Sequence, residues 1–361
     1  MASGSQYCTR DVLPLTAMVT MECTNVGLNT LYKAATLIGM SPHVFVVYSY
    51  GVAALVLLPS PFFSHRSGVL PPLNFSILCK IGLLGLIGCT SQIMGFTGIN
   101  YGSPTLASAI SNLVPAFTFI FALIFRMEKV ALRSSSSRAK VLGTVISISG
   151  AFVVTFYKGP TLISTPSPSI SLHNRLSSSQ SGWVLGSFFL TTEYILVPLW
   201  YIVQAQIMKE YPAEFTVVFF YNLCVSILAA IVGLISEPDS SAWKIRLDLA
   251  LVSILCSGIF GSGLNNTVHT WAIRLKGPLY VSMFKPLSIA IAVATGVMFL
   301  GDTLYLGSVI GATIISVGFY TVMWGKAKEE LVEDNETSTL EESTQKYPLL
   351  QSYKNEDMES R

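Results

Sequence analysis

Long apolar stretches alternate with short polar or charged turns from Val12 to Trp324. Each apolar stretch has about twenty residues or more, enough for an α-helix to cross about 30 Å of hydrocarbon. Reading from one turn to the next predicts five helices in each half of the chain. The predicted helices cover residues 12–37, 43–63, 75–99, 104–125, 139–157, 183–205, 214–235, 248–272, 279–300 and 304–325.

This pattern predicts an all-α integral membrane protein with ten transmembrane helices. Between the two sets of helices, residues 158–182 contain three prolines and many serines, a composition typical of a polar linker. The expected organisation is a cytoplasmic N-terminus at 1–11, a first repeat at 12–157, the linker at 158–182, a second repeat at 183–325 and a disordered acidic cytoplasmic tail at 326–361.

The two halves resemble each other, because several residue types recur at a nearly constant offset of 168 to 174 positions. The matching pairs are Glu22 and Glu193, Pro42 and Pro212, Pro104 and Pro278, Ser108 and Ser282, Glu128 and Asp302, Gly143 and Gly311, and Gly150 and Gly318. Since five is an odd number, the second copy must enter the membrane in the opposite orientation. The result is an inverted repeat, which is typical of carriers that alternate access around a midplane site.

Composition and charge agree with this topology. Hydrophobic residues make up 51% of the chain and charged residues 12%, a balance that favours lipid over water as the solvent. The loop from Arg126 to Lys140 carries five basic residues, and basic loops stay on the cytoplasmic side. This orientation places both termini in the cytoplasm. Ten of the twenty acidic residues lie between Glu329 and Glu359, which is why a solvated, disordered tail is expected.

Five short segments carry a resemblance to a known family. They are FVVYSYGVAALVLLP (45–59), SPTLASAISNLVPAFTFIFALIFRMEKV (103–130), MKEYPAEF (208–215), KGPLYVSMFKPL (276–287) and LGDTLYLGSVIGA (300–312). Together they resemble the plant Walls-Are-Thin-related, nodulin-like transporters of the EamA-type branch of the drug/metabolite transporter superfamily. The resemblance implies ten helices in two EamA repeats. It also implies substrates that include amino acids and, for at least one member, auxin.

The first helix carries a polar stripe, because Glu22, Asn25, Asn29 and Lys33 are spaced by 3, 4 and 4 positions. Such a stripe must face protein or water, and an acid retained in the membrane usually has a partner or a function. Glu22 could instead only hold helices together. Glu193 occupies the matching place in the second half, so the two acids are expected on opposite walls of one cavity. There, either acid could carry a proton during transport or receive the amino group of a substrate.

Other helices offer further candidates for a binding site. Asn265, Asn266 and His269 lie at helical spacing and could hydrogen-bond a carboxylate, although a lone membrane histidine is also a common structural donor. Gln92 could reach the same cavity or bridge helices. Lys285 is expected either to pair with an acid such as Glu22 or Glu193, or to attract an anionic group of the substrate.

The fourth and ninth helices each contain a proline. Asn112 and Pro115 lie in the fourth helix, and Pro286 lies in the ninth. A proline inside a membrane helix frees a carbonyl group and bends the helix, so Pro115 and Pro286 are candidate hinges and Asn112 a candidate ligand. Glycines seven apart in the fifth and tenth helices predict close helix packing and leave a homodimer open.

These features predict a carrier of small organic solutes, with amino acids as the expected cargo and flux in either direction. Its partners are the solute and the lipid bilayer, in the plasma membrane rather than the vacuolar or another endomembrane. We expect no enzyme, cofactor or metal, because no GxGD, HExxH, GxSxG or metal-type cysteine spacing occurs. Short basic loops do not suggest a nucleic-acid partner. The alternatives are an exporter of auxin or another metabolite from the same family, and a membrane receptor without transport.

Overall fold

The computed structural model describes residues 12–61, 73–101, 110–111, 113–127, 134–157, 159–163, 180–245, 248–295 and 304–345. Within these ranges the chain is almost entirely helical, and helices lie at all ten predicted positions. Six of the described helices are long and apolar enough to cross a membrane, judged by length and composition. The prediction of an all-α membrane protein is therefore confirmed.

The helices of the first half follow the predicted order. They are α2 (Leu13–Leu37), α3 (Pro42–Leu57), α5 (Phe75–Tyr101), α7 (Val114–Ile124) and α8 (Ser135–Phe156). The second half contains α9 (Gln180–Glu210), α10 (Glu214–Ser236), α11 (Leu249–Cys256), the π-helix η3 (Ser257–Asn265), α12 (Asn266–Lys276), α13 (Pro278–Ser282), α14 (Lys285–Thr295) and α15 (Leu306–Gln345). Prolines stand in the first turns of α2, α3, α7 and α13, where a missing N–H costs no helical hydrogen bond.

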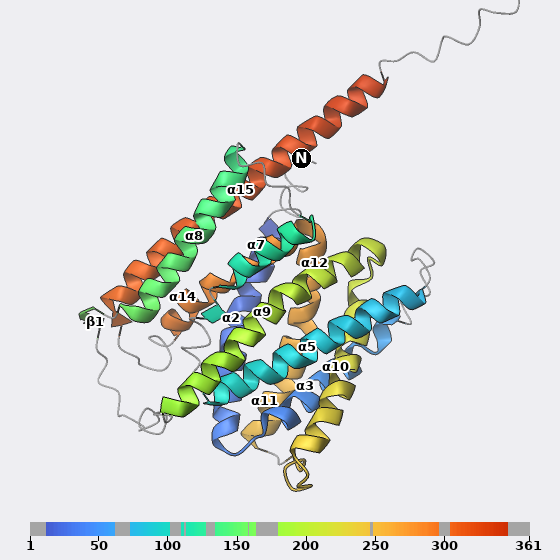
Figure 1. Cartoon of the computed structure of the whole chain (residues 1–361), viewed down its shortest axis with the longest axis vertical. Helices are drawn as coiled ribbons and strands as arrows, with labels where there is room; N and C mark the ends of the chain where they lie inside the picture. Colours follow the sequence, from blue (N-terminus) through green and yellow to red (C-terminus); the bar gives the residue numbers. More distant parts are fainter. Residues whose placement is uncertain are drawn as a thin grey trace, which may run out of the picture.

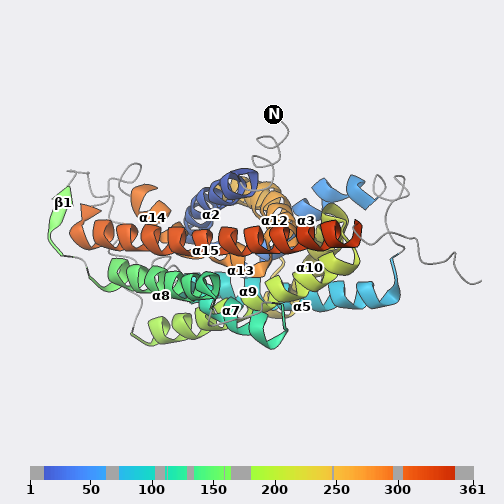
Figure 2. The same ribbon diagram turned by 90° about the horizontal axis from the view of Figure 1, so that it is seen from above.

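The helices pack as two halves that exchange partners (Figures 1 and 2). α3 packs on α10 and α8 on α15, so these helices contact their own counterparts in the other half. α9 contacts α5 and α7, which belong to the first half. In the same way, α2 contacts α11 with η3 and also α14, which are the matching helices of the second half. This exchange of contacts agrees with the two-repeat organisation that the sequence predicts.

The ninth predicted helix, 279–300, is not continuous. α13 ends at Ser282, a turn follows at residues 283–284, and α14 starts at Lys285 with Pro286 in its first turn. The ring of Pro286 has no N–H to continue the helical ladder, so the chain must restart its helix there. Residues 296–303 lie outside the described part of the chain.

The fourth predicted helix, 104–125, shows a similar break. Ile110 and Ser111 are helical, Leu113 lies in a turn, and α7 begins at Val114 with Pro115 in its first turn. Residues 102–109 and 112 lie outside the described part. Both prolines that the sequence nominates as hinges therefore stand at the start of the second helical segment of their span, one in each repeat.

The eighth predicted helix, 248–272, has an irregular centre. Its middle, SGIFGSGLN, is wound as the π-helix η3 rather than as a regular α-helix. Nδ2 of the buried Asn222 on α10 donates to the carbonyl of Ser262 at 3.1 Å. π-Helical segments leave backbone groups out of the α-helical ladder and occur frequently at functional sites.

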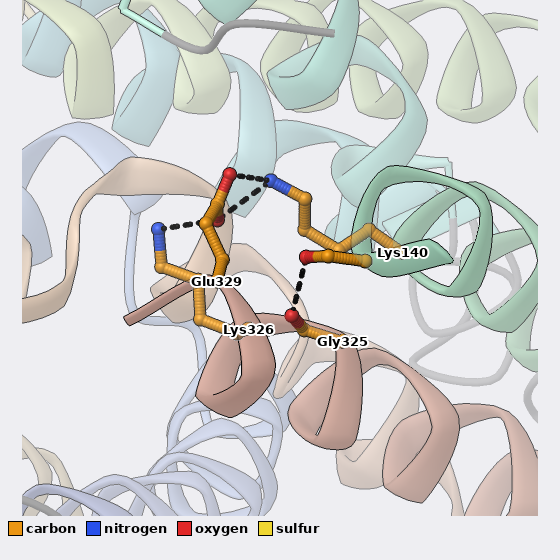
Figure 3. Close-up of polar contacts among 5 residues, drawn as sticks. Lys140, Gly325, Lys326 and Glu329 are labelled. Carbon is orange, nitrogen blue, oxygen red and sulfur yellow. Dashed lines mark hydrogen bonds and ion pairs between the residues drawn. The ribbon is translucent and has the colours of Figure 1, made fainter. Parts of the chain in front are cut away.

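α8 and α15 form a long pair beside the rest of the bundle (Figure 1). A side chain at Gly143 or Gly150 of α8 would overlap the backbone of α15, so these glycines allow the close approach predicted from the sequence. At the end of the seam, the ammonium of Lys140 lies 2.9 and 3.0 Å from the two carboxylate oxygens of Glu329, which Lys326 also approaches at 3.5 Å (Figure 3).

Two polar segments differ from the prediction. A disordered tail is expected from residue 326, but α15 continues to Gln345. Glutamate, lysine and leucine, which dominate the start of this stretch, favour helix, and Glu329 is held by its ion pair with Lys140. Residues 346–361 lie outside the described part. In the linker, β1 (Thr161–Ile163) pairs antiparallel with β2 (Leu304–Tyr305), a contact that the pattern does not predict.

Candidate functional site

A cavity of about 300 Å³ lies among helices of both repeats. Its wall is formed by residues of α2, α3, α5, α9, α10, η3, α12 and α14, together with Ser111. The charged or titratable acid and base groups in the described part of this wall are Glu22, Glu193, His269 and Lys285. The cavity extends from this group toward Tyr32 and Ile99, near the ends of α2 and α5.

Most of the residues nominated from the sequence meet around this cavity. The wall contains Glu22, Asn25, Gln92, Glu193, Asn265, Asn266, His269 and Lys285. Lys33 lies in α2 and Asn112 follows Ser111, but the side chain of Lys33 and all of Asn112 lie outside what the structure describes. The expected meeting of Glu22 and Glu193, one from each repeat, is found in this wall.

Glu22 and Lys285 form an ion pair across the two repeats. The ammonium of Lys285 lies 2.9 Å from Oε1 of Glu22, whose side chain is only 1% exposed. Of the two roles considered for Lys285, pairing with an acid is the one observed. Lys285 is the first residue of α14. Because the span breaks just before it, the side chain of Lys285 lies at the N-terminus of a helix and not within a continuous one.

His269 approaches the same carboxylate oxygen of Glu22 as Lys285 does. Its Nε2 is 3.9 Å from Oε1 of Glu22, and its Nδ1 is 2.9 Å from the carbonyl oxygen of Asn265. Because a carbonyl oxygen can only accept, Nδ1 carries the hydrogen, and in the neutral ring Nε2 is left as an acceptor. The ring of Tyr201 stacks nearly parallel to that of His269, at an angle of 14°.

Glu193 has a different environment, although it occupies the matching place in the second repeat. Its carboxyl group packs against Gly95 of α5, where an added Cβ would overlap it. Oε2 of Glu193 is buried and has no hydrogen-bond partner among the described residues. Lys285, the lysine of the described wall, is bound to Glu22. Glu193 is therefore a carboxylate without an ion-pair partner in the described wall of the cavity.

Comparison with known proteins shows which family the chain belongs to. Residues 17–156 match the EamA-like transporter family. The WAT1-related protein At3g28050 of Arabidopsis thaliana is 64% identical to the chain over 364 residues, covering 98% of this chain and 99% of that protein. The chain belongs to the WAT1-related family. A second member, WAT1-related protein At5g40240 of the same plant, is 52% identical. The match covers 91% of this chain and 90% of that protein.

A solved crystal structure shares the fold of this WAT1-related protein. It superposes with a TM-score of 0.61 at 14% identity, over 87% of this chain and 99% of the other. The family resemblance stated from the sequence is confirmed, and with it the general class: this WAT1-related protein is a multi-pass membrane transporter.

The aromatic residues of the wall are not among those predicted from the sequence. They are Tyr32, Phe45, Tyr50, Phe96, Tyr194, Trp200, Tyr201 and Tyr221. In a membrane helix such residues read as ordinary packing. A helical projection from Glu193 would have found part of this set in the WAT1-related chain, because Val197, Trp200 and Tyr201 follow it at 4, 7 and 8 positions and share its face.

The end of the bundle beyond the Glu22–Lys285 pair is filled by apolar side chains. Met18, Ile207, Val217, Ile273 and Phe284 are among the buried residues of this core. They lie near the start of α2 and the end of α9, opposite the end toward which the cavity of the WAT1-related protein extends. The site is thus closed by packed side chains on one side.

Proposed function

We propose that this WAT1-related transporter carries amino acids by alternating access of its two inverted repeats around the cavity. The observation that supports this most directly is the carboxyl group of Glu193, which has no ion-pair partner among the described residues of a cavity whose other acid is bound to Lys285. A volume of about 300 Å³ lies at the lower end of the roughly 300–1,000 Å³ of small-molecule sites, as a solute of amino-acid size requires.

In this proposal the solute is held at mid-membrane by groups of opposite character. The ammonium of the solute pairs with Glu193. Its carboxylate accepts from amide groups such as those of Gln92, Asn265 and Asn266, all in the cavity wall. Glu22 and Lys285 keep the two repeats in register around the solute.

The hinges of the proposed cycle are the starts of α7 and α14. Pro115 and Pro286 interrupt hydrogen bonding in the fourth and ninth spans, about one helical turn apart when the two halves are matched. Each span can therefore bend there without losing a regular ladder. The direction of flux is set by the solute gradient or by a proton carried on Glu22 or Glu193. Both possibilities are open to the same experiment.

That experiment measures uptake and efflux of labelled amino acids and auxin in a heterologous cell at two external pH values. Saturable amino-acid flux supports the proposal, and its dependence on pH in the wild type but not in Glu22→Gln assigns the proton to Glu22. Flux that changes neither with pH nor in Glu22→Gln would support the carrier and indicate a structural role for Glu22. Absence of flux for the whole panel, with the protein verified at the cell surface, contradicts the amino-acid assignment.

The alternatives predict other results in this assay. Auxin is a carboxylate without an amine, so it leaves Glu193 unmatched; saturable flux of auxin alone would favour the metabolite exporter. Binding of a solute without flux would favour a receptor. No feature of the described cavity favours either one over the amino-acid carrier.

The proposal includes the membrane and the topology. We place the protein in the plasma membrane. The basic loops predict that both termini lie in the cytoplasm. Complementation of a split fluorescent protein fused to each terminus, with its partner fragment in the cytosol, tests the orientation. A homodimer stays a prediction; the glycines of α8 that suggested it are used within the chain, against α15, so cross-linking in membranes must look for another surface.

A further inference from the structure

We infer that Glu193 selects the solutes of this carrier by their amine, and that a carboxylate on the solute is dispensable. The cavity thus accepts ring-bearing amines of amino-acid size, whether or not they carry an acid group. This inference rests on the proposed function, because it takes the cavity as the transport site.

The charges of the wall are the first argument. Within the described lining, the two carboxylates face one lysine and one histidine. Lys285 is bound to Glu22 at 2.9 Å, and His269 uses its Nδ1 hydrogen on the carbonyl of Asn265. Glu193 is therefore the acid of the described wall whose charge, when it is ionised, has no ion-pair partner there. A cavity with one uncompensated negative charge in low dielectric attracts a cation and repels an anion.

The unsatisfied atoms of the wall are the second argument. Oε2 of Glu193 and Oδ1 of Asn265 are both buried without a hydrogen-bond partner among the described residues, and both residues line the cavity. The amide oxygen of Asn265 can only accept a hydrogen bond, and the same holds for the carboxylate of Glu193 when it is ionised. Buried acceptors of this kind are normally satisfied, and an ammonium group supplies three N–H donors and no acceptor. A carboxylate entering the cavity would add acceptors and find Lys285 already occupied.

The space around the carboxyl group of Glu193 is the third argument. Gly95 of α5 leaves the space in which the carboxyl group of Glu193 rests, so the acid is held against the helix rather than folded into another ion pair. Tyr194, Trp200 and Tyr201 line the cavity from the same helix as Glu193. Aromatic side chains favour both a cation and a second ring as neighbours, which matches an amine attached to an aromatic group.

Three compounds with the same ring separate the roles of the two groups. Phenylalanine has both groups, phenethylamine has only the amine, and 3-phenylpropanoate has only the carboxylate. The measurement is the rise in thermal unfolding temperature of the purified full-length protein with each compound, because a ligand that binds the native state stabilises it. Phenylalanine and phenethylamine are expected to stabilise the wild type at similar concentrations, and 3-phenylpropanoate is expected to have no effect.

Variants at Glu193 then test the residue itself. In Glu193→Gln, the concentration of either amine needed for half of the shift should rise by about ten-fold or more, a change of one decade in affinity. Glu193→Asp keeps the charge and should keep the preference for amines, so it serves if the glutamine variant folds poorly. Glu210→Gln is the matched control, because Glu210 lies on the same helix but pairs with Lys80 outside the cavity; it should behave as the wild type.

Three results overturn the inference: stabilisation by 3-phenylpropanoate equal to that by the amines, a requirement for both groups, or no stabilisation by any of the three. Counter-flow of labelled amino acids in proteoliposomes separates this failure from that of the proposed function. Flux without amine selection keeps the carrier and removes the role of Glu193. Amine-selective binding without any flux keeps the role of Glu193 and contradicts transport.

Discussion

Lys285 and Glu22 lie 2.9 Å apart and connect the second repeat to the first across the cavity. Glu22 lies in the middle of α2, and Lys285 begins α14 after the break in the ninth span. Any rocking of one repeat against the other must carry this pair along or break it. The pair therefore links the stability of the observed arrangement to the transport cycle.

The first prediction concerns this ion pair. Replacing one partner, in Glu22→Gln or Lys285→Met, leaves the other charge buried and should destabilise the protein by about 3–5 kcal/mol, whereas the double variant should lose less than either single variant. Unfolding in detergent, followed by tryptophan fluorescence, measures the three values. A double variant that loses the sum of the two single losses would show that the residues are not coupled.

The sequence predicts the position of the helices and of Glu22, Glu193 and Lys285 well, because an ionisable group in an apolar helix stands out wherever it lies. It does not predict which acid binds Lys285. That choice depends on the direction that α14 takes after the break before Pro286, and the proline marks the break without fixing that direction. The π-helical centre of the eighth span is not predicted either, because the three glycines of SGIFGSGLN weaken a regular helix but do not specify a π-helix.

The second prediction concerns the support of this π-helix. Asn222 is fully buried and donates to the carbonyl of Ser262, and its own oxygen is 3.5 Å from Nδ2 of Asn266. Asn222→Leu should therefore destabilise the protein by about 1–3 kcal/mol, because it leaves a buried carbonyl without a donor. Thermal unfolding provides the measurement.

The control for this prediction lies on the same helix. Ser226 donates to the carbonyl of Val47. This site is half-buried, so the removal of the hydroxyl in Ser226→Ala costs less than the loss of a donor at a fully buried site. The loss of stability should be well below that of Asn222→Leu. Equal losses in the two variants would mean that the π-helix does not depend on Asn222.

The third prediction concerns the seam between α8 and α15. A Cβ at Gly143 would lie 2.7 Å from the carbonyl oxygen of Gly318, which is backbone and cannot rotate away. Gly143→Val should cost about 1–3 kcal/mol through overpacking, while Gly27→Ala, on α2 with no atom within 4 Å of its added Cβ, should not reduce stability. If both variants unfold at the wild-type temperature, the two helices do not pack as closely as the structure shows.

The fourth prediction tests whether Gly95 acts through the position of the Glu193 carboxyl group or through general helix packing. A Cβ at Gly95 would overlap the carboxyl group of Glu193, whereas one at Gly82, on the same helix α5, meets no atom within 4 Å. Gly95→Ala should displace the carboxyl group and lower transport by about ten-fold, the effect of roughly 1.4 kcal/mol. Gly82→Ala should transport as the wild type does.

A second substitution shows whether the loss in Gly95→Ala acts through Glu193. Glu193→Asp shortens the side chain by one methylene, so it makes room for the new methyl group while keeping the charge. The double variant should therefore transport better than Gly95→Ala alone, measured as initial uptake rate per molecule at the surface. A double variant that is worse than both single variants would place the effect of Gly95 in the packing of α5 on α9, and the role of the glycine would then be structural.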